Sequence, residues 1–226
     1  MGAIPRWRMA QLFSPSVDFA ARLVAVAIVL LLGGGVYAFY LLNRSAYWTN
    51  VGVEIPQPVP FSHQHHVAEL GIDCRFCHRS VTTSAYAGMP DTLTCMTCHS
   101  QVWKDAPMLA PVRQSLAKNK PLYWNRVNEM PQFVYFNHSI HVAKGVGCTS
   151  CHGRIDEMAI TYKPVDFEMQ WCLKCHRHPD GALRPQLSQV FQMDWTASHD
   201  PTAAHALVVA RHIDSDHLTD CSACHR

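Results

Sequence analysis

Residues 61–78 read FSHQHHVAELGIDCRFCH, and the last five of these residues form a pattern that recurs along the chain. The form C-x-x-C-H occurs five times, accounts for all ten cysteines and always ends in a histidine. A zinc site would need two C-x-x-C pairs and no histidine after each, whereas a thioredoxin-like centre would need only one pair. Disulfides would not require the repeated histidine either. The five motifs occupy residues 74–78, 95–99, 148–152, 172–176 and 221–225.

This pattern is the attachment signature of c-type haem. Two thiols three positions apart can each add to a vinyl group on one edge of the macrocycle, and the adjacent imidazole then binds the iron. We therefore predict five covalently bound haem c groups. The predicted thioether cysteines are Cys74, Cys77, Cys95, Cys98, Cys148, Cys151, Cys172, Cys175, Cys221 and Cys224, and the predicted proximal iron ligands are His78, His99, His152, His176 and His225.

The composition excludes two broad classes of protein. The chain has 226 residues and a formal charge of +2, which argues against a nucleic-acid partner held by phosphate contacts. Because 48% of the residues are apolar and 16% are charged, a wholly disordered chain is also excluded.

The N-terminal region has the composition of a membrane anchor. Residues 23–42, LVAVAIVLLLGGGVYAFYLL, contain no charged side chain and are long enough to cross a hydrocarbon core of about 30 Å. The run is longer than that of a signal peptide and no A-x-A site follows it, so we expect an uncleaved anchor with its span over about 20–42. Arg6, Arg8 and Arg22 precede the span and only Arg44 closely follows it. This asymmetry predicts a cytoplasmic N-terminus and a periplasmic remainder.

The sequence divides into an N-terminal cytoplasmic segment and anchor over 1–44, a Pro-rich linker over 45–60 and a haem domain over 61–226. Steps of 21, 53, 24 and 49 residues separate the first cysteines of successive motifs, so short and long steps alternate. The form F-[S/N]-H-x-x-H precedes the first and third motifs. We interpret 61–126 and 136–200 as a duplicated haem-pair unit, followed by a fifth haem at the C-terminus.

The two H-x-x-H segments supply candidate distal ligands. Histidines three positions apart lie on one face of a helix, so one imidazole can reach its own haem and the other a neighbouring haem. We predict His63, His66, His138 and His141 as distal iron ligands, and we interpret His65 and His178 as surface residues.

The fifth iron has no ligand that the spacing singles out. Met158 and Met169 lie between the third and fourth motifs, and His212 and His217 precede the fifth. A methionine ligand would raise the reduction potential relative to two histidines. An iron with an open face is the third alternative, and His199, His205 and Met89 are weaker candidates.

Several segments resemble known multihaem families. F-S-H-x-x-H before C-x-x-C-H resembles the cytochrome c3/c7 class, which implies a mainly α domain with little regular structure. One N-terminal helix, five motifs, the segment GRIDEM at 153–158 and MQWCLKCHR at 169–177 resemble the pentahaem subunit of alternative complex III, a membrane quinol:electron-acceptor oxidoreductase. That resemblance implies a complex in the bacterial cytoplasmic membrane. Its implied partners are an integral quinol-oxidising subunit, an iron–sulfur subunit, membrane lipid, and a monohaem cytochrome or other small electron acceptor.

The expected function is electron relay from quinol oxidation to a periplasmic acceptor, without catalytic residues or substrate chemistry of the chain's own. The alternative is a stand-alone quinol dehydrogenase of the NapC/NrfH type, which binds quinol itself. A catalytic multihaem enzyme such as a pentahaem nitrite reductase fits less well, because all five motifs end in histidine and the chain is short.

Overall fold

The structure is a computed structural model that describes residues 14–196 and 200–225. The chain divides into two compact units, residues 1–49 and residues 50–226. Arg6 and Arg8, on which the expected membrane orientation partly depends, lie outside the described residues, as does His199.

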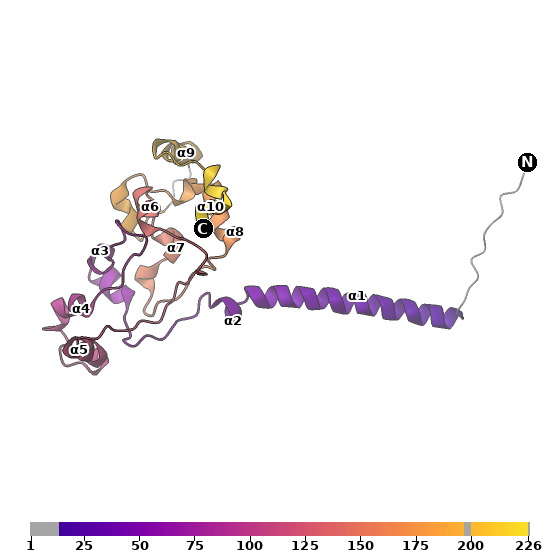
Figure 1. Ribbon diagram of the computed structural model, residues 1–226, viewed down its shortest axis with the longest axis horizontal. Helices are drawn as coiled ribbons and strands as arrows, with labels where there is room; N and C mark the ends of the chain where they lie inside the picture. The colour runs from indigo at the N-terminus through magenta and orange to yellow at the C-terminus, as the bar shows by residue number, and fades with distance from the viewer. Residues whose placement is uncertain (1–13, 197–199, 226) are drawn as a thin grey trace, which may run out of the picture. The chain divides into compact units, whose positions relative to one another are not determined.

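The first unit is dominated by the helix α1, Pro15–Arg44, which is followed by the short helix α2, Ala46–Thr49 (Figure 1). Pro15 begins α1 where a missing N–H costs nothing, and Asp18 in the first turn pairs with Arg22 at 2.8 Å. An 18-residue window of the 30-residue helix α1 has a mean hydropathy of 2.3, and no residue of the helix is buried. One N-terminal helix is therefore long and apolar enough to cross a membrane, as the sequence predicts.

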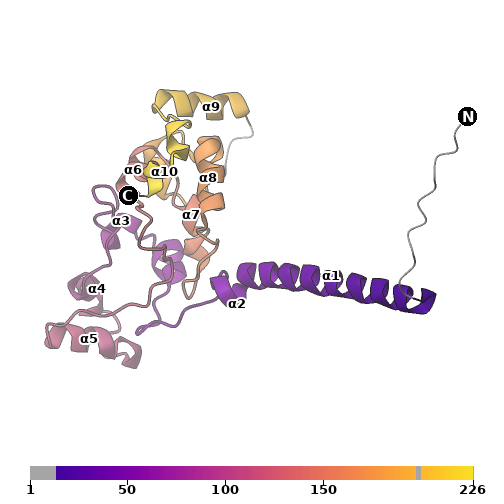
Figure 2. The same cartoon turned by 45° about the vertical axis from the view of Figure 1, so that its right-hand side comes forward.

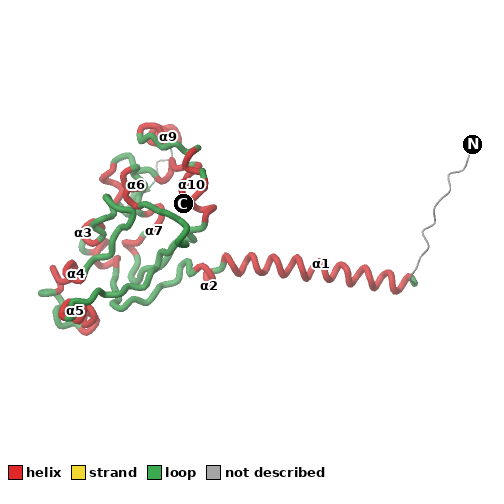
Figure 3. The backbone as a smooth tube through the Cα atoms, in the orientation of Figure 1, coloured by secondary structure: helices red, strands yellow, loops and turns green. Residues whose placement is uncertain are grey.

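The regular structure of the second unit is helical, and its described residues contain isolated bridges rather than strands. Loops join short helices throughout (Figure 3). The mainly α class with little regular structure is confirmed for this part. The α-helices are α3 (Cys74–Cys77), α4 (Thr92–His99), α5 (Ala110–Ala117), α6 (His138–Ala143), α7 (Thr149–His152), α8 (Met169–Arg177), α9 (Pro201–Ala210) and α10 (Cys221–Cys224). The short 3-10 and π turns are η1 (Gln64–Glu69), η2 (Pro107–Leu109), η3 (Ile155–Glu157), η4 (Pro179–Ala182), η5 (Leu187–Phe191) and η6 (His217–Thr219).

Local capping explains where several of these helices begin. The Asp73 carboxylate accepts from the backbone N–H of Arg75 at the start of α3, and Asp91 accepts from Thr94 at the start of α4. Asn137 caps α6 through Ile140 in the same way. Each side chain satisfies one backbone donor that a helix start leaves unpaired.

Residues 50–60 of the Pro-rich linker make contacts within the second unit. The backbone N–H of Gly52 donates to Lys163 at 2.8 Å, and Val51 forms a parallel bridge with the same residue. Val59 packs with Leu109 and Val112 in a buried apolar cluster. The prolines keep this segment extended, and an extended backbone can pair with another segment.

Two cations join α6 to α9 at their C-terminal ends. Lys144 Nζ donates to the carbonyl of Arg211 at 2.6 Å, and Arg211 Nη1 donates to the carbonyl of Lys144 at 2.7 Å. Each side chain therefore satisfies a carbonyl that the end of the other helix leaves unpaired.

Replacing Val112 by Ala should destabilise the second unit, because Val112 is 2% exposed and fills the cluster with Val59 and Leu109. We expect the free energy of unfolding of the haem-loaded chain in detergent to fall by about 2 kcal/mol. Urea unfolding of Leu116→Ala, which alters an exposed residue of the same helix, is the control and should change little. Equal losses in the two variants would contradict this packing.

Candidate haem sites

Each cysteine pair lies on a single helical turn. The pairs lie on α3, on α4, at the start of α7, on α8 and on α10, and all ten thiols are free. Residues three apart on a helix share a face, so both sulfur atoms of a pair can reach one edge of a flat ligand. Burial raises the pKa of Cys148 and of Cys151 to about 12, so these two thiols stay protonated at neutral pH.

The histidine of every motif is held through its Nδ1 atom. In four motifs Nδ1 lies within hydrogen-bond distance of a backbone carbonyl oxygen, and in the third motif it faces the side chain of Asn128 at 3.2 Å. A metal-bound imidazole commonly donates its second N–H in this way, which fixes the ring and leaves Nε2 for the metal. The backbone acceptors are Gly88 for His78 (2.7 Å), Val102 for His99 (3.0 Å), Leu218 for His176 (3.0 Å) and Phe133 for His225 (3.1 Å).

The four predicted distal histidines are anchored in the same manner. Their Nδ1 atoms face Thr161 Oγ1 for His63 (3.0 Å), and the carbonyls of Ser62 for His66 (2.8 Å), Ala85 for His138 (2.9 Å) and Asn137 for His141 (2.7 Å). All nine predicted ligands therefore present Nε2 as the nitrogen available to iron.

Three of the distal histidines face a motif histidine at the separation that one iron would impose. A metal–nitrogen distance of about 2.0–2.1 Å, plus about 1.1 Å from a nitrogen to its ring centre, puts the centres of two axial imidazoles about 6.3 Å apart. The observed separations are 6.2 Å for His66 and His99, 6.4 Å for His138 and His152, and 6.2 Å for His141 and His176. These residues therefore fit three irons that each have two histidine ligands.

His63 is the remaining member of the distal set. Burial, followed by the nearby His78, lowers the pKa of His63 to about 4. Burial also lowers the pKa of His66 and of His141. A histidine must be neutral to bind a metal, and these shifts keep the imidazoles neutral at physiological pH.

The two H-x-x-H segments repeat one geometry in detail. Phe61 contacts His63 edge to face at 88° and lies over His66 at 25°, with ring centres 4.9 and 4.4 Å apart. Phe136 contacts His138 at 88° and His141 at 31°, with ring centres 4.7 and 4.5 Å apart. The F-x-H-x-x-H spacing that the two segments share thus corresponds to the same packing of the phenylalanine on the two histidines. This agreement is what an internal duplication would give.

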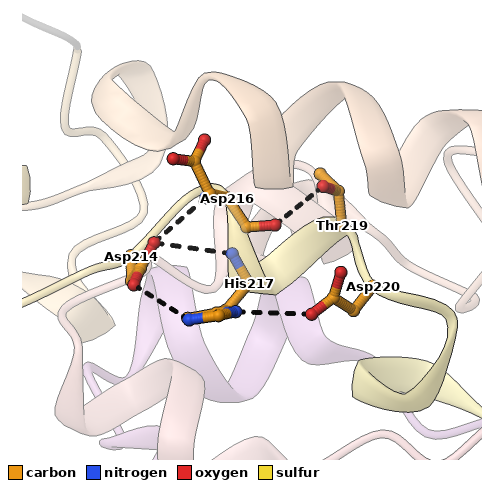
Figure 4. Close-up of polar contacts among 5 residues, drawn as sticks. All are labelled: Asp214, Asp216, His217, Thr219 and Asp220. Carbon is orange, nitrogen blue, oxygen red and sulfur yellow. Dashed lines mark hydrogen bonds and ion pairs between the residues drawn. The ribbon is translucent and has the colours of Figure 1, made fainter.

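The other described histidines with a polar partner face carboxylates. His65 lies 2.7 Å from Glu69 and stacks on Trp103, and His205 lies 3.3 Å from Asp180. His217 lies between two carboxylates, with Nδ1 3.4 Å from Asp220 and Nε2 3.7 Å from Asp214 (Figure 4). Because both of its nitrogens face acidic groups, His217 is less suited to be the fifth distal ligand.

The two methionine candidates differ sharply in exposure. Met158 is 3% exposed, whereas Met169 is 61% exposed at the start of α8. The carbonyl of Met158 accepts from the backbone N–H of Gln64 in η1, so Met158 lies beside the first H-x-x-H segment. The ring contact of His225 within the described residues is with Phe133, at 5.8 Å. For the fifth iron, Met158, Met169, His212 and an open face therefore stay as the alternatives.

The first motif adjoins both the second and the third. Arg79 follows the first motif and its Nη2 donates to Thr94 in α4 at 3.1 Å. Burial, and then the neighbouring Cys95, raise the pKa of Cys77. On the other side, burial and then Cys74 raise the pKa of Cys148.

The fourth motif lies between the third and the fifth. Burial and then Cys175 raise the pKa of Cys151, whereas burial and then Cys224 raise that of Cys172. Neighbouring thiols thus connect the second motif to the first, the first to the third, the third to the fourth and the fourth to the fifth. Figures 1 and 2 show the helices α4, α3, α7 and α8 in this order across the second unit, with α10 beside α8.

The anchoring groups are the functional atoms that sequence reasoning misses. Most of them are backbone carbonyls, whose position depends on the chain path and not on residue type. Thr161 and Asn128 are side chains, but neither stands at a fixed offset from a motif.

Comparison with known proteins supports the class that the motifs predict. No family model matches the chain. A curated protein of Nitratidesulfovibrio vulgaris is 35% identical over 97 residues, which are 42% of this chain and 45% of that protein. It is the multihaem cytochrome c subunit of a menaquinone reductase. The match covers less than half of either chain, and it supports a multihaem cytochrome c.

Replacing His138 by Ala should open one iron, because its imidazole faces His152 at the separation of two axial ligands. We expect the reduced variant to bind one more carbon monoxide per chain than the parent. His65→Ala is the matched control, because His65 faces Glu69 and should leave the carbon monoxide stoichiometry unchanged. A His138 variant that binds no additional carbon monoxide would refute this ligand.

Proposed function

We propose that this chain is a membrane-anchored pentahaem cytochrome c that relays electrons from quinol oxidation in the membrane to a periplasmic acceptor. The observation that carries this proposal is the set of three imidazole pairs at 6.2–6.4 Å. Each pair joins a motif histidine to a histidine of an H-x-x-H segment.

The residues present fit haem c in number, type and spacing. When bound, haem c supplies a one-electron carrier whose potential depends on axial ligands, burial and hydrogen bonds to those ligands. The cysteine pairs would hold one edge of each macrocycle, and the Nδ1 hydrogen bonds would orient the imidazoles that bind its iron. Two histidines on an iron would leave no coordination site for a substrate, so the three facing pairs favour electron relay over catalysis at those motifs.

The order of the motifs defines two ends for the relay. We propose that the second motif, on α4, and the fifth motif, on α10, are the two ends of the relay. We propose that electrons enter at one end and leave at the other, and that neighbouring motifs are close enough for each transfer between them.

We propose that α1, which is long and apolar enough to cross a membrane, anchors the chain in the bacterial cytoplasmic membrane. The excess of arginines before the span favours a cytoplasmic N-terminus and a periplasmic second unit. We propose an assembly of alternative complex III type that contains an integral quinol-oxidising subunit and an iron–sulfur subunit. A monohaem cytochrome or another small carrier would accept the electrons. The relative's membership of a menaquinone reductase supports a link to quinone.

Loss of one cysteine pair should remove one haem. We expect the parent to carry five haems per chain, measured by the pyridine haemochrome spectrum and by intact mass. Cys221→Ser with Cys224→Ser should carry four. The control is Ser222→Ala, which changes a residue between these cysteines and should retain five. A parent chain with fewer than five haems would contradict the assignment of all five motifs.

Purification from native membranes tests the relay. We expect the chain to travel with a multi-span subunit and an iron–sulfur protein, and the assembly to reduce an added monohaem cytochrome with quinol. Quinol oxidation by the isolated chain would instead favour a stand-alone quinol dehydrogenase. An assembly that reduces quinone but does not oxidise quinol would reverse the proposed direction.

A further inference from the structure

The proximal histidine of the third motif, His152, differs from the other four, because its Nδ1 faces a side chain, that of Asn128, and not a backbone carbonyl. The amide nitrogen Nδ2 of Asn128 lies 3.2 Å from Nδ1 of His152. The oxygen Oδ1 of the same amide is buried and has no hydrogen-bond partner. A buried, unpaired amide oxygen costs free energy, so its position needs a reason.

Iron binding supplies that reason. When Nε2 of His152 binds iron, the proton of the neutral ring resides on Nδ1, as it does for the motif histidines that donate to backbone carbonyls. Two N–H donors, Nδ1 and Nδ2, would then face each other. A half-turn of the amide places Oδ1 on the Nδ1 proton, which removes this conflict and satisfies the buried oxygen.

We propose that Asn128 is a positioning residue that sets the reduction potential of the third haem, because its Oδ1 accepts the Nδ1 proton of His152. This inference rests on the proposed function, since it requires iron on His152. The other four motif histidines donate to backbone carbonyls, which a substitution changes little. The third is therefore the motif at which a single side chain controls the ligand.

The strength of the acceptor determines how much electron density the imidazole gives to the iron. A stronger acceptor stabilises the ferric state and lowers the potential, whereas loss of the acceptor raises it. The burial of the Asn128 oxygen enhances this effect, because weakly screened interactions are stronger. The third motif is also the middle one in the order of the five, so Asn128 acts at the centre of the relay.

Two substitutions of similar size separate this role from a merely structural one. Asn128→Asp keeps an acceptor and strengthens it, and Asn128→Leu removes it. In redox titrations of the haem-loaded full chain, we expect the Asp variant to shift the oxidised-to-reduced ratio of one haem about tenfold toward the oxidised form. For a one-electron couple, this corresponds to a fall in the reduction potential of about 59 mV. The Leu variant should shift the same haem toward the reduced form.

The affected haem is identified by electron paramagnetic resonance, as the one whose low-spin ferric signal is lost in His138→Ala. Asn125→Ala is the matched control, because Asn125 bonds the carbonyl of Pro56 in the same segment and should leave all five potentials unchanged. Shifts in the same direction in both Asn128 variants, or shifts at a different haem, would overturn the proposal.

The haem count of each sample separates the possible failures. A parent with five reversible haems and an Asp variant with unchanged potentials would refute the role of Asn128 and leave the relay intact. If the Leu variant does not fold, the Asp variant decides, because its side chain has the size and shape of the parent's and keeps an acceptor oxygen. A parent without haem would refute the proposed function and this inference together.

Discussion

A histidine that binds a metal through Nε2 needs an acceptor for the proton on Nδ1, and the second unit is arranged around this requirement. Nine predicted ligands have Nδ1 within 3.2 Å of a neighbouring polar atom. Most of the acceptors are backbone carbonyls of loops, which have no partner within a regular helix or strand and would otherwise bond to water. The extensive loop structure is therefore consistent with the site, because short helices present cysteines and histidines while the loops between them supply acceptors.

The contacts of the ligands also link distant parts of the chain. His138 bonds the carbonyl of Ala85, and His225 bonds the carbonyl of Phe133. His63 reaches Thr161 across 98 residues. Few apolar side chains are fully buried in this unit, and the cluster around Val59, Leu109 and Val112 is small. Hydrogen bonds to ligands, and the cofactors they imply, therefore take over much of the role that a hydrophobic core has in other domains of this size.

Residue type and spacing predicted the motifs, the H-x-x-H segments and the apolar helix, because each of these depends on local chemistry. The structure places His66 beside His99, His138 beside His152 and His141 beside His176, and the assignment of these residues as iron ligands stays a prediction. The order of the motifs in space was not predictable, since it depends on how loops return. The pairing of residues 50–60 with residues near Lys163 was missed for the same reason, as was Asn128, which has no motif around it.

The paired bonds between Lys144 and Arg211 have an evolutionary consequence. Each side chain bonds the backbone of the other residue, so neither acceptor depends on which side chain is present there. The Arg211 guanidinium also donates to the carbonyls of Arg184 and Pro185, so a lysine could not replace all of its bonds. A neutral residue at either position would leave the other helix end without its donor. Both positions should accordingly stay positively charged during evolution. The end of α6, a helix that carries two predicted ligands, would then depend on a residue in the segment before the fifth motif.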